Sequence, residues 1–192
     1  MMNPGSTEAT IQPTILLTAA ALLSAPLYAQ QLDFLNHSRP VLDAHNCYPY
    51  EGRWADRIDR ALAQGFPVSI EQDIAWAADP ATGNGRPVVS HTPKTTGSEP
   101  TLRDYFFERV RPIIERALAT NDRDHWPLII LHFDFKSNET QVLRAVWDLL
   151  GEYQSWLTTA PKTVNPSLLA PLDPKPILVV CHFTHSLARL EA

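Results

Sequence analysis

Polar side chains with catalytic potential recur in four apolar segments of the sequence. Each segment has the alternating or β-branched pattern of a strand, and side chains two residues apart on a strand share one face. By this rule the polar residues gather on one face of each segment, and the opposite face is apolar. The polar sets are Asp43 and His45 with the adjacent Asn46; Glu71 and Asp73; His91; and His132, Asp134 and Lys136.

Residues of these types favour a metal-assisted reaction. A buried carboxylate or imidazole is destabilising by several kcal/mol unless it is paired or bound to a metal. The side chains that offer oxygen ligands are Asn46, Glu71, Asp73 and Asp134. Oxygen ligands suit a hard cation such as Mg²⁺ or Ca²⁺. His45 and His91 beside such a cation are suited to move protons near neutral pH.

The elements that must position these residues alternate along the chain. Strands are predicted over 40–46, 68–76, 87–91, 127–136 and 176–183, and helices over 54–64, 101–120 and 139–157. Apolar strands that alternate with helices are typical of a parallel sheet covered by helices, which places a site at the carboxyl ends of the strands. The step from 76 to 87 is too short for a helical crossover. Those two strands are therefore either antiparallel or joined by an irregular loop.

The order of the motifs resembles a known superfamily over roughly Val41 to Lys136. The motifs are His45-Asn46, Glu71-x-Asp73, His91 at the end of Gly85-Arg-Pro-Val-Val-Ser-His91, and Asp134-x-Lys136. They are similar to those of the phosphatidylinositol-specific phospholipase C-like phosphodiesterases, which include the glycerophosphodiester phosphodiesterases. His45-Asn46 favours the phospholipase-like branch. Asp134-x-Lys136 stands where the glycerophosphodiesterases carry Glu-x-Lys.

The resemblance implies an α/β fold of the TIM-type (β/α) barrel kind. A complete barrel needs eight strands and about 250 residues, and this sequence contains five predicted strands. Residues 30–192 are therefore expected to form a phosphodiesterase barrel domain that is truncated at its C-terminus.

The resemblance also implies an activity, that of a metal-dependent phosphoric diester hydrolase acting on a lipid or small-molecule phosphodiester. In this interpretation His45 and His91 are catalytic, Lys136 directs positive charge toward the phosphate, and one Ca²⁺ or Mg²⁺ is bound. The implied metal ligands are Asn46, Glu71, Asp73 and Asp134. Two alternatives stay open: an inactive domain that binds phosphate headgroups, and a glycosidase that uses Glu71 and Asp134 as its carboxylate pair.

Composition excludes several other classes of protein. The 192 residues are 44% hydrophobic and 19% charged and carry a formal charge of −5. This is typical of a globular enzyme, and the net negative charge disfavours electrostatic binding of nucleic acid or an anionic bilayer as the main activity. At most peripheral contact with a membrane is expected. The aromatic residues that follow the first strand, Tyr48, Tyr50 and Trp54, are expected mainly to pack their loop.

The N-terminal region predicts export from the cytoplasm. Residues 15–27 form an uncharged, mostly apolar run of 13 residues, shorter than the roughly 20 residues that span a bilayer. A small residue, Ala29, follows and offers a cleavage point. Residues 1–29 are therefore predicted to be a signal peptide, and the protein to be secreted or periplasmic. Because no Lys or Arg precedes the run, a retained hydrophobic segment is the alternative.

Overall fold

The computed structural model describes residues 41–49, 53–79, 81–82, 84–137, 139–165 and 170–182. The predicted signal segment over 1–29 lies outside these residues. In chain order the main elements are β1 (Leu42–Ala44), α3 (Arg57–Leu62), β2 (Val68–Ala78), β3 (Gly85–Val89), a π-helical turn (Arg103–Phe107), α4 (Glu108–Thr120), β4 (Ile129–Phe135), α5 (Thr140–Glu152) and β5 (Ile177–His182). Short 3₁₀ turns lie at Arg123–His125 and Gln154–Trp156. Within the described residues, no helix has the length and apolar content needed to cross a membrane.

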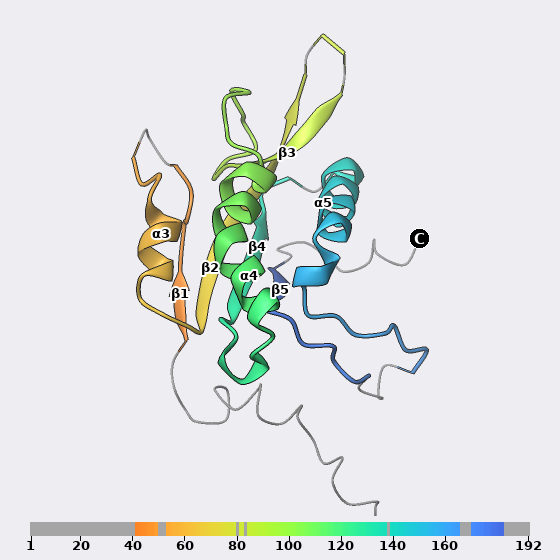
Figure 1. Ribbon diagram of the computed structural model, residues 1–192. Helices are drawn as coiled ribbons and strands as arrows, with labels where there is room; N and C mark the ends of the chain where they lie inside the picture. The colour runs from red at the N-terminus through yellow and green to blue at the C-terminus, as the bar shows by residue number, and fades with distance from the viewer. Residues whose placement is uncertain are drawn as a thin grey trace, which may run out of the picture.

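The five strands form one mixed sheet around β2 (Figure 1). β1, β2, β4 and β5 are parallel neighbours in that order, as the alternating pattern predicts. β3 pairs antiparallel with β2 over Ile74–Ala78. The short step from 76 to 87 is therefore a hairpin, which decides between the two connections that the sequence allows. The described strands form an open sheet; they do not close a barrel.

β2 is the central strand because it pairs with three other strands. One edge pairs with β4 along Val68–Ile74. The opposite edge pairs first with β1 over Val68–Ile70 and then with β3 over Ile74–Ala78. β1 and β3 thus approach the middle of β2 along the same edge from opposite directions. This arrangement brings the segments that follow β1 and β3 together.

The apolar core holds β2 and β4 against the helices. Ile70 and Ile74 of β2 and Phe133 of β4 are fully buried in one cluster with residues of the α4 and α5 segments. Phe107 belongs to this cluster and stacks on Tyr153 with the ring centres 4.1 Å apart. Burying a large apolar side chain is worth about 1.5–3 kcal/mol. The core therefore fixes the two strands whose alternate residues carry the polar groups.

The long predicted helix over 101–120 forms as two joined pieces. Thr101 and Asp104 bond reciprocally at its start: the Asp104 amide donates to Thr101 Oγ1, and the Thr101 hydroxyl donates to the Asp104 carboxylate. Both bonds use the Thr101 hydroxyl, so the pair holds the start of the helix without the second backbone bond of a full capping box. A π-helical turn follows, and α4 continues through Pro112 to Thr120.

Candidate active site

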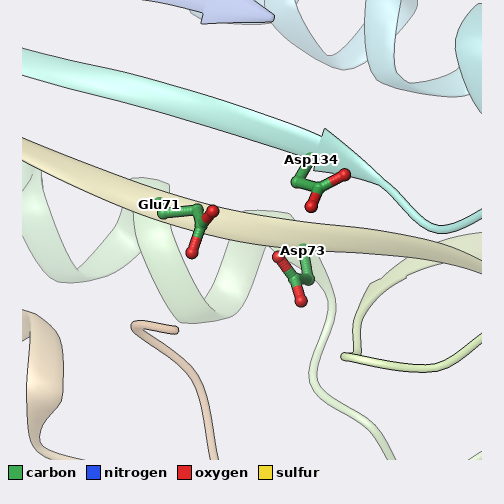
Figure 2. A group of neighbouring side chains, drawn as sticks. All are labelled: Glu71, Asp73 and Asp134. Carbon is green, nitrogen blue, oxygen red and sulfur yellow. The ribbon is translucent and has the colours of Figure 1, made fainter. Parts of the chain in front are cut away.

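Three carboxylates from neighbouring strands meet on one face of the sheet (Figure 2). Glu71 and Asp73 lie two residues apart on β2, and Asp134 of β4 pairs in register with Asp73. One oxygen from each of the three lies within 4.8 Å of the others. We call these three residues the carboxylate cluster. The sequence predicts this grouping because residues two apart on a strand share a face.

Asp73 is the most deeply placed member of the carboxylate cluster. It is fully buried, and its Oδ1 has no hydrogen-bond partner among the described residues. Its other oxygen, Oδ2, is surrounded by donors from Tyr48, His91 and Lys136. A buried polar atom without a partner costs about 1–3 kcal/mol. Asp73 Oδ1 is therefore an available acceptor inside the site.

The topology explains why the loops after β1 and β3 reach the carboxylate cluster. The amide of Cys47 donates to the Glu71 carbonyl at 3.3 Å, and the amide of Ser90 donates to the Asp73 carbonyl at 2.9 Å. The bond from Ser90 extends the pairing of β2 with β3 by one residue, and the bond from Cys47 fastens the loop after β1 to β2 three residues beyond the end of that strand. The site consequently lies at the middle of β2. The barrel pattern predicts a site formed only by the carboxyl ends of parallel strands, and the observed site differs from that prediction.

The two histidines predicted to be catalytic flank the carboxylate cluster on its solvent side. His45 Nε2 lies 3.3 Å from Glu71 Oε2, and His91 Nδ1 lies 2.9 Å from Asp73 Oδ2. The imidazole side chains are 69% and 47% exposed, whereas the two carboxylates are 8% and 1% exposed. Each buried carboxylate thus orients a ring that solvent and a ligand can reach.

Lys136 enters the carboxylate cluster as an internal counter-charge. Its Nζ lies 2.7 Å from Asp134 Oδ2 and 3.1 Å from Asp73 Oδ2. Partial burial opposes protonation, but the hydrogen bonds to the two carboxylates outweigh it and raise the pKa of the ammonium. Three carboxylates and one ammonium leave two negative charges. A divalent cation would balance this charge, and an all-oxygen donor set suits Ca²⁺ or Mg²⁺.

Asn46 contacts the carboxylate cluster through its backbone. It has a left-handed conformation with φ of 55°, and its amide donates to Glu71 Oε2 at 2.8 Å. Arg57 Nη1 donates to its carbonyl, also at 2.8 Å. The side-chain oxygen of Asn46 also contacts the Tyr48 hydroxyl, whose single proton is shared between Asn46 and Asp73. The role of Asn46 as a metal ligand therefore stays a prediction, whereas its role in shaping the loop is direct.

Tyr48 is a site residue that the sequence reasoning missed. It is 1% exposed, and its hydroxyl lies 2.7 Å from Asp73 Oδ2 and 3.0 Å from His91 Nδ1. Burial, followed by the bond to Asp73, raises the pKa of this phenol well above its usual range, so it stays protonated. The available signal is its spacing of two residues from Asn46. That signal is weak because β1 ends at Ala44, and the rule that residues two apart share a face applies only within a strand.

The remaining predicted polar residues lie at the margin of the site. His132 pairs in register with Glu71, and its Nδ1 is 3.9 Å from Asp43 Oδ2. His132 does not belong to the carboxylate cluster.

Comparisons with protein-family models, with curated proteins and with solved structures gave no significant match. The likeness to the phospholipase C-like phosphodiesterases therefore depends on the order of the motifs in the sequence.

Proposed function

We propose that this chain is a metal-dependent phosphodiesterase of the phospholipase C-like type, built on part of a TIM-type (β/α) barrel. The observation that carries the proposal is the buried carboxylate cluster, with Asp73 Oδ1 unpartnered, between two exposed imidazoles. A cation bound to Asp73 Oδ1 would remove the cost of its desolvation.

Glu71, Asp73 and Asp134 are the residues that would hold Ca²⁺ or Mg²⁺, with Asn46 as a further candidate. Such a cation, when bound, neutralises charge on the non-bridging oxygens of a phosphodiester. Lys136 adds a fixed positive charge beside Asp134, and preorganised charge of this kind favours the more anionic transition state.

The two histidines divide the proton transfers. One imidazole accepts the proton of the attacking hydroxyl, either water or a neighbouring group of the substrate, as the new P–O bond forms. The other imidazole donates a proton to the alcohol that leaves as the old P–O bond breaks. His45 is oriented by Glu71 and His91 by Asp73, so the ring positions are set before substrate binds.

The proposed substrate is a lipid-derived or small-molecule phosphodiester. Access to a lipid requires no more than peripheral contact with a membrane. The apolar segment within residues 1–29 supports a secreted or periplasmic location.

Hydrolysis of bis(p-nitrophenyl) phosphate by the full chain tests the proposal. We expect release of p-nitrophenol with Ca²⁺ or Mg²⁺ and none after chelation. His45→Ala and His91→Ala should each lower turnover by about 10²–10⁴-fold. His125→Ala is the matched control, because His125 also bonds a carboxylate, Asp122 at 2.9 Å, but on an exposed turn.

Three outcomes would contradict the proposal. Full turnover by His45→Ala or His91→Ala would remove the proposed acid and base. Phosphodiester binding without turnover would support the inactive headgroup-binding domain instead. Hydrolysis of aryl glycosides that a chelator leaves unaffected would support the glycosidase.

A further inference from the structure

The segment that carries His45 is a loop, and the imidazole ring has little packing of its own to hold it. β1 ends at Ala44, one residue before His45. The ring is 69% exposed, and its Nε2 lies 3.3 Å from Glu71 Oε2. Asn46 follows in a left-handed conformation with φ of 55°. The position of the ring beside Glu71 therefore depends on the backbone of residues 45–47.

Two side chains from other elements hold this backbone by consecutive carbonyl groups. Arg57 Nη1 of α3 donates to the Asn46 carbonyl at 2.8 Å. Gln72 Nε2 of β2 donates to the Cys47 carbonyl at 2.5 Å and to the Glu71 carbonyl at 2.6 Å. The Cys47 amide donates to the same Glu71 carbonyl at 3.3 Å. Cys47 is thus fastened to β2 through both its amide and its carbonyl.

Gln72 is an unusual residue for its position in β2. It is fully buried, and strand alternation places it on the face of Ile70 and Ile74, which belong to the apolar core. Its Oε1 has no hydrogen-bond partner among the described residues. An apolar side chain would avoid the cost of burying this oxygen. The two donor hydrogens of the amide are what an apolar side chain lacks, and both face the carbonyls of Cys47 and Glu71.

We propose that Gln72 is a positioning residue for the reaction, whose amide fixes the loop after β1 and so keeps His45 beside Glu71. This inference rests on the proposed function, in which His45 transfers a proton. The Gln72 side chain lies on the opposite face of β2 from the carboxylate cluster, so it acts through the backbone of Cys47. The carboxylate cluster is held by the pairing of β2 with β4. Loss of the Gln72 amide should therefore slow the proton transfer and leave the binding of cation and substrate nearly unchanged.

Amide hydrogen exchange of the full chain, followed by NMR, tests whether Gln72 holds the loop. Gln72→Met keeps the length of the side chain but has no donor. In this variant the amides of Asn46 and Cys47 should exchange about 5–10-fold faster, as expected for the loss of one hydrogen bond. Val146→Ala is the matched control, because it removes buried apolar volume from α5 and should leave the two loop amides unchanged. Wild-type exchange of these amides in Gln72→Met would overturn the inference.

Kinetics with metal and bis(p-nitrophenyl) phosphate test the consequence for His45. Gln72→Met should lower kcat about 10-fold and change KM and the cation Kd by less than about twofold. Arg57→Met removes the other bond to the loop from a partly exposed residue, and it should also lower kcat if Gln72→Met does not fold. An unchanged kcat despite faster exchange, or an equal fall in kcat for Val146→Ala, would overturn the positioning role.

The two measurements separate this inference from the proposed function. Absence of hydrolysis by the wild type counts against the proposed function. The exchange rates need no turnover, so they still decide whether Gln72 holds the loop.

Discussion

Replacing Lys136 with Met separates the internal ion pair from the proposed metal site. The substitution keeps most of the side-chain volume but removes the ammonium from Asp73 and Asp134, which lie 3.1 and 2.7 Å from it. Both carboxylates then remain in the carboxylate cluster without their counter-charge. We expect the metal-free protein to become less stable and to bind a divalent cation more tightly.

The expected size of the effect follows from distance and burial. Two unit charges about 3 Å apart attract by roughly 5 kcal/mol at an effective dielectric constant near 20. The side chains of Lys136 and Asp134 are 21% and 23% exposed, so water screens part of this attraction. We therefore expect a loss of about 2–4 kcal/mol in the free energy of unfolding, somewhat below the roughly 3–5 kcal/mol lost when a fully buried pair is broken. A loss of about 3 kcal/mol lowers Tm by roughly 6–12 °C in a domain of this size.

Chemical denaturation of the metal-free protein and of the protein with Ca²⁺ or Mg²⁺ measures both effects. Lys175→Met is the matched control, because Lys175 bonds Asp173 at 2.7 Å but this carboxylate is 62% exposed. Exposed pairs contribute about 0–1 kcal/mol. A cation at 100 times the Kd of the wild type stabilises the folded wild type by about 2.7 kcal/mol, and the same cation concentration should stabilise Lys136→Met by more, because its Kd is expected to be lower. If Lys136→Met behaves like Lys175→Met and gains nothing more from the cation, the charge argument is wrong.

Two further substitutions test the site and the fold. Tyr48→Phe removes a buried hydroxyl from Asp73 and should lower stability by about 1–2 kcal/mol and turnover several-fold; unchanged turnover with intact circular dichroism would show that the phenol does not order the site. Gly85→Ala should lower stability by about 1–3 kcal/mol, because its Cβ would lie 2.5 Å from the Trp76 ring. Gly151→Ala in α5, where a Cβ meets nothing within 4 Å, should be neutral or stabilising. A Gly85→Ala protein as stable as the wild type would contradict the packing at Trp76.

Much of the fold follows from residue patterns. β-branched and apolar runs predict all five strands, and helical periodicity predicts the segments that become α3, α4 and α5. The direction of β3 does not follow from such patterns, because a short connection permits either a hairpin or an irregular crossover. The register along Ile74–Ala78 decides it. Closure into a barrel requires more than these five strands, so the local residue patterns do not determine whether the sheet closes.

The candidate site is predictable where strand alternation controls it. Glu71, Asp73 and Asp134 follow from the two-residue spacing and the parallel pairing of β2 with β4. Tyr48 does not, because its position depends on a loop that turns at Asn46 with φ of 55°. The contact of Lys136 with Asp73 is also a matter of tertiary geometry. Strand alternation places Lys136 on the same face as Asp134. It does not show that the Lys136 side chain extends across to Asp73 on β2.

Calorimetric titration of the full chain with Ca²⁺ and with Mg²⁺ tests the central claim most directly. The account predicts that one of these ions binds at one site per chain and that Asp73→Asn weakens binding by about 100-fold or more. Asp173→Asn, which alters a carboxylate that is 62% exposed outside the carboxylate cluster, should bind like the wild type. If neither ion binds the wild type, or if Asp73→Asn binds the ion with unchanged affinity, the carboxylate cluster is not a metal site and the proposed phosphodiesterase mechanism fails.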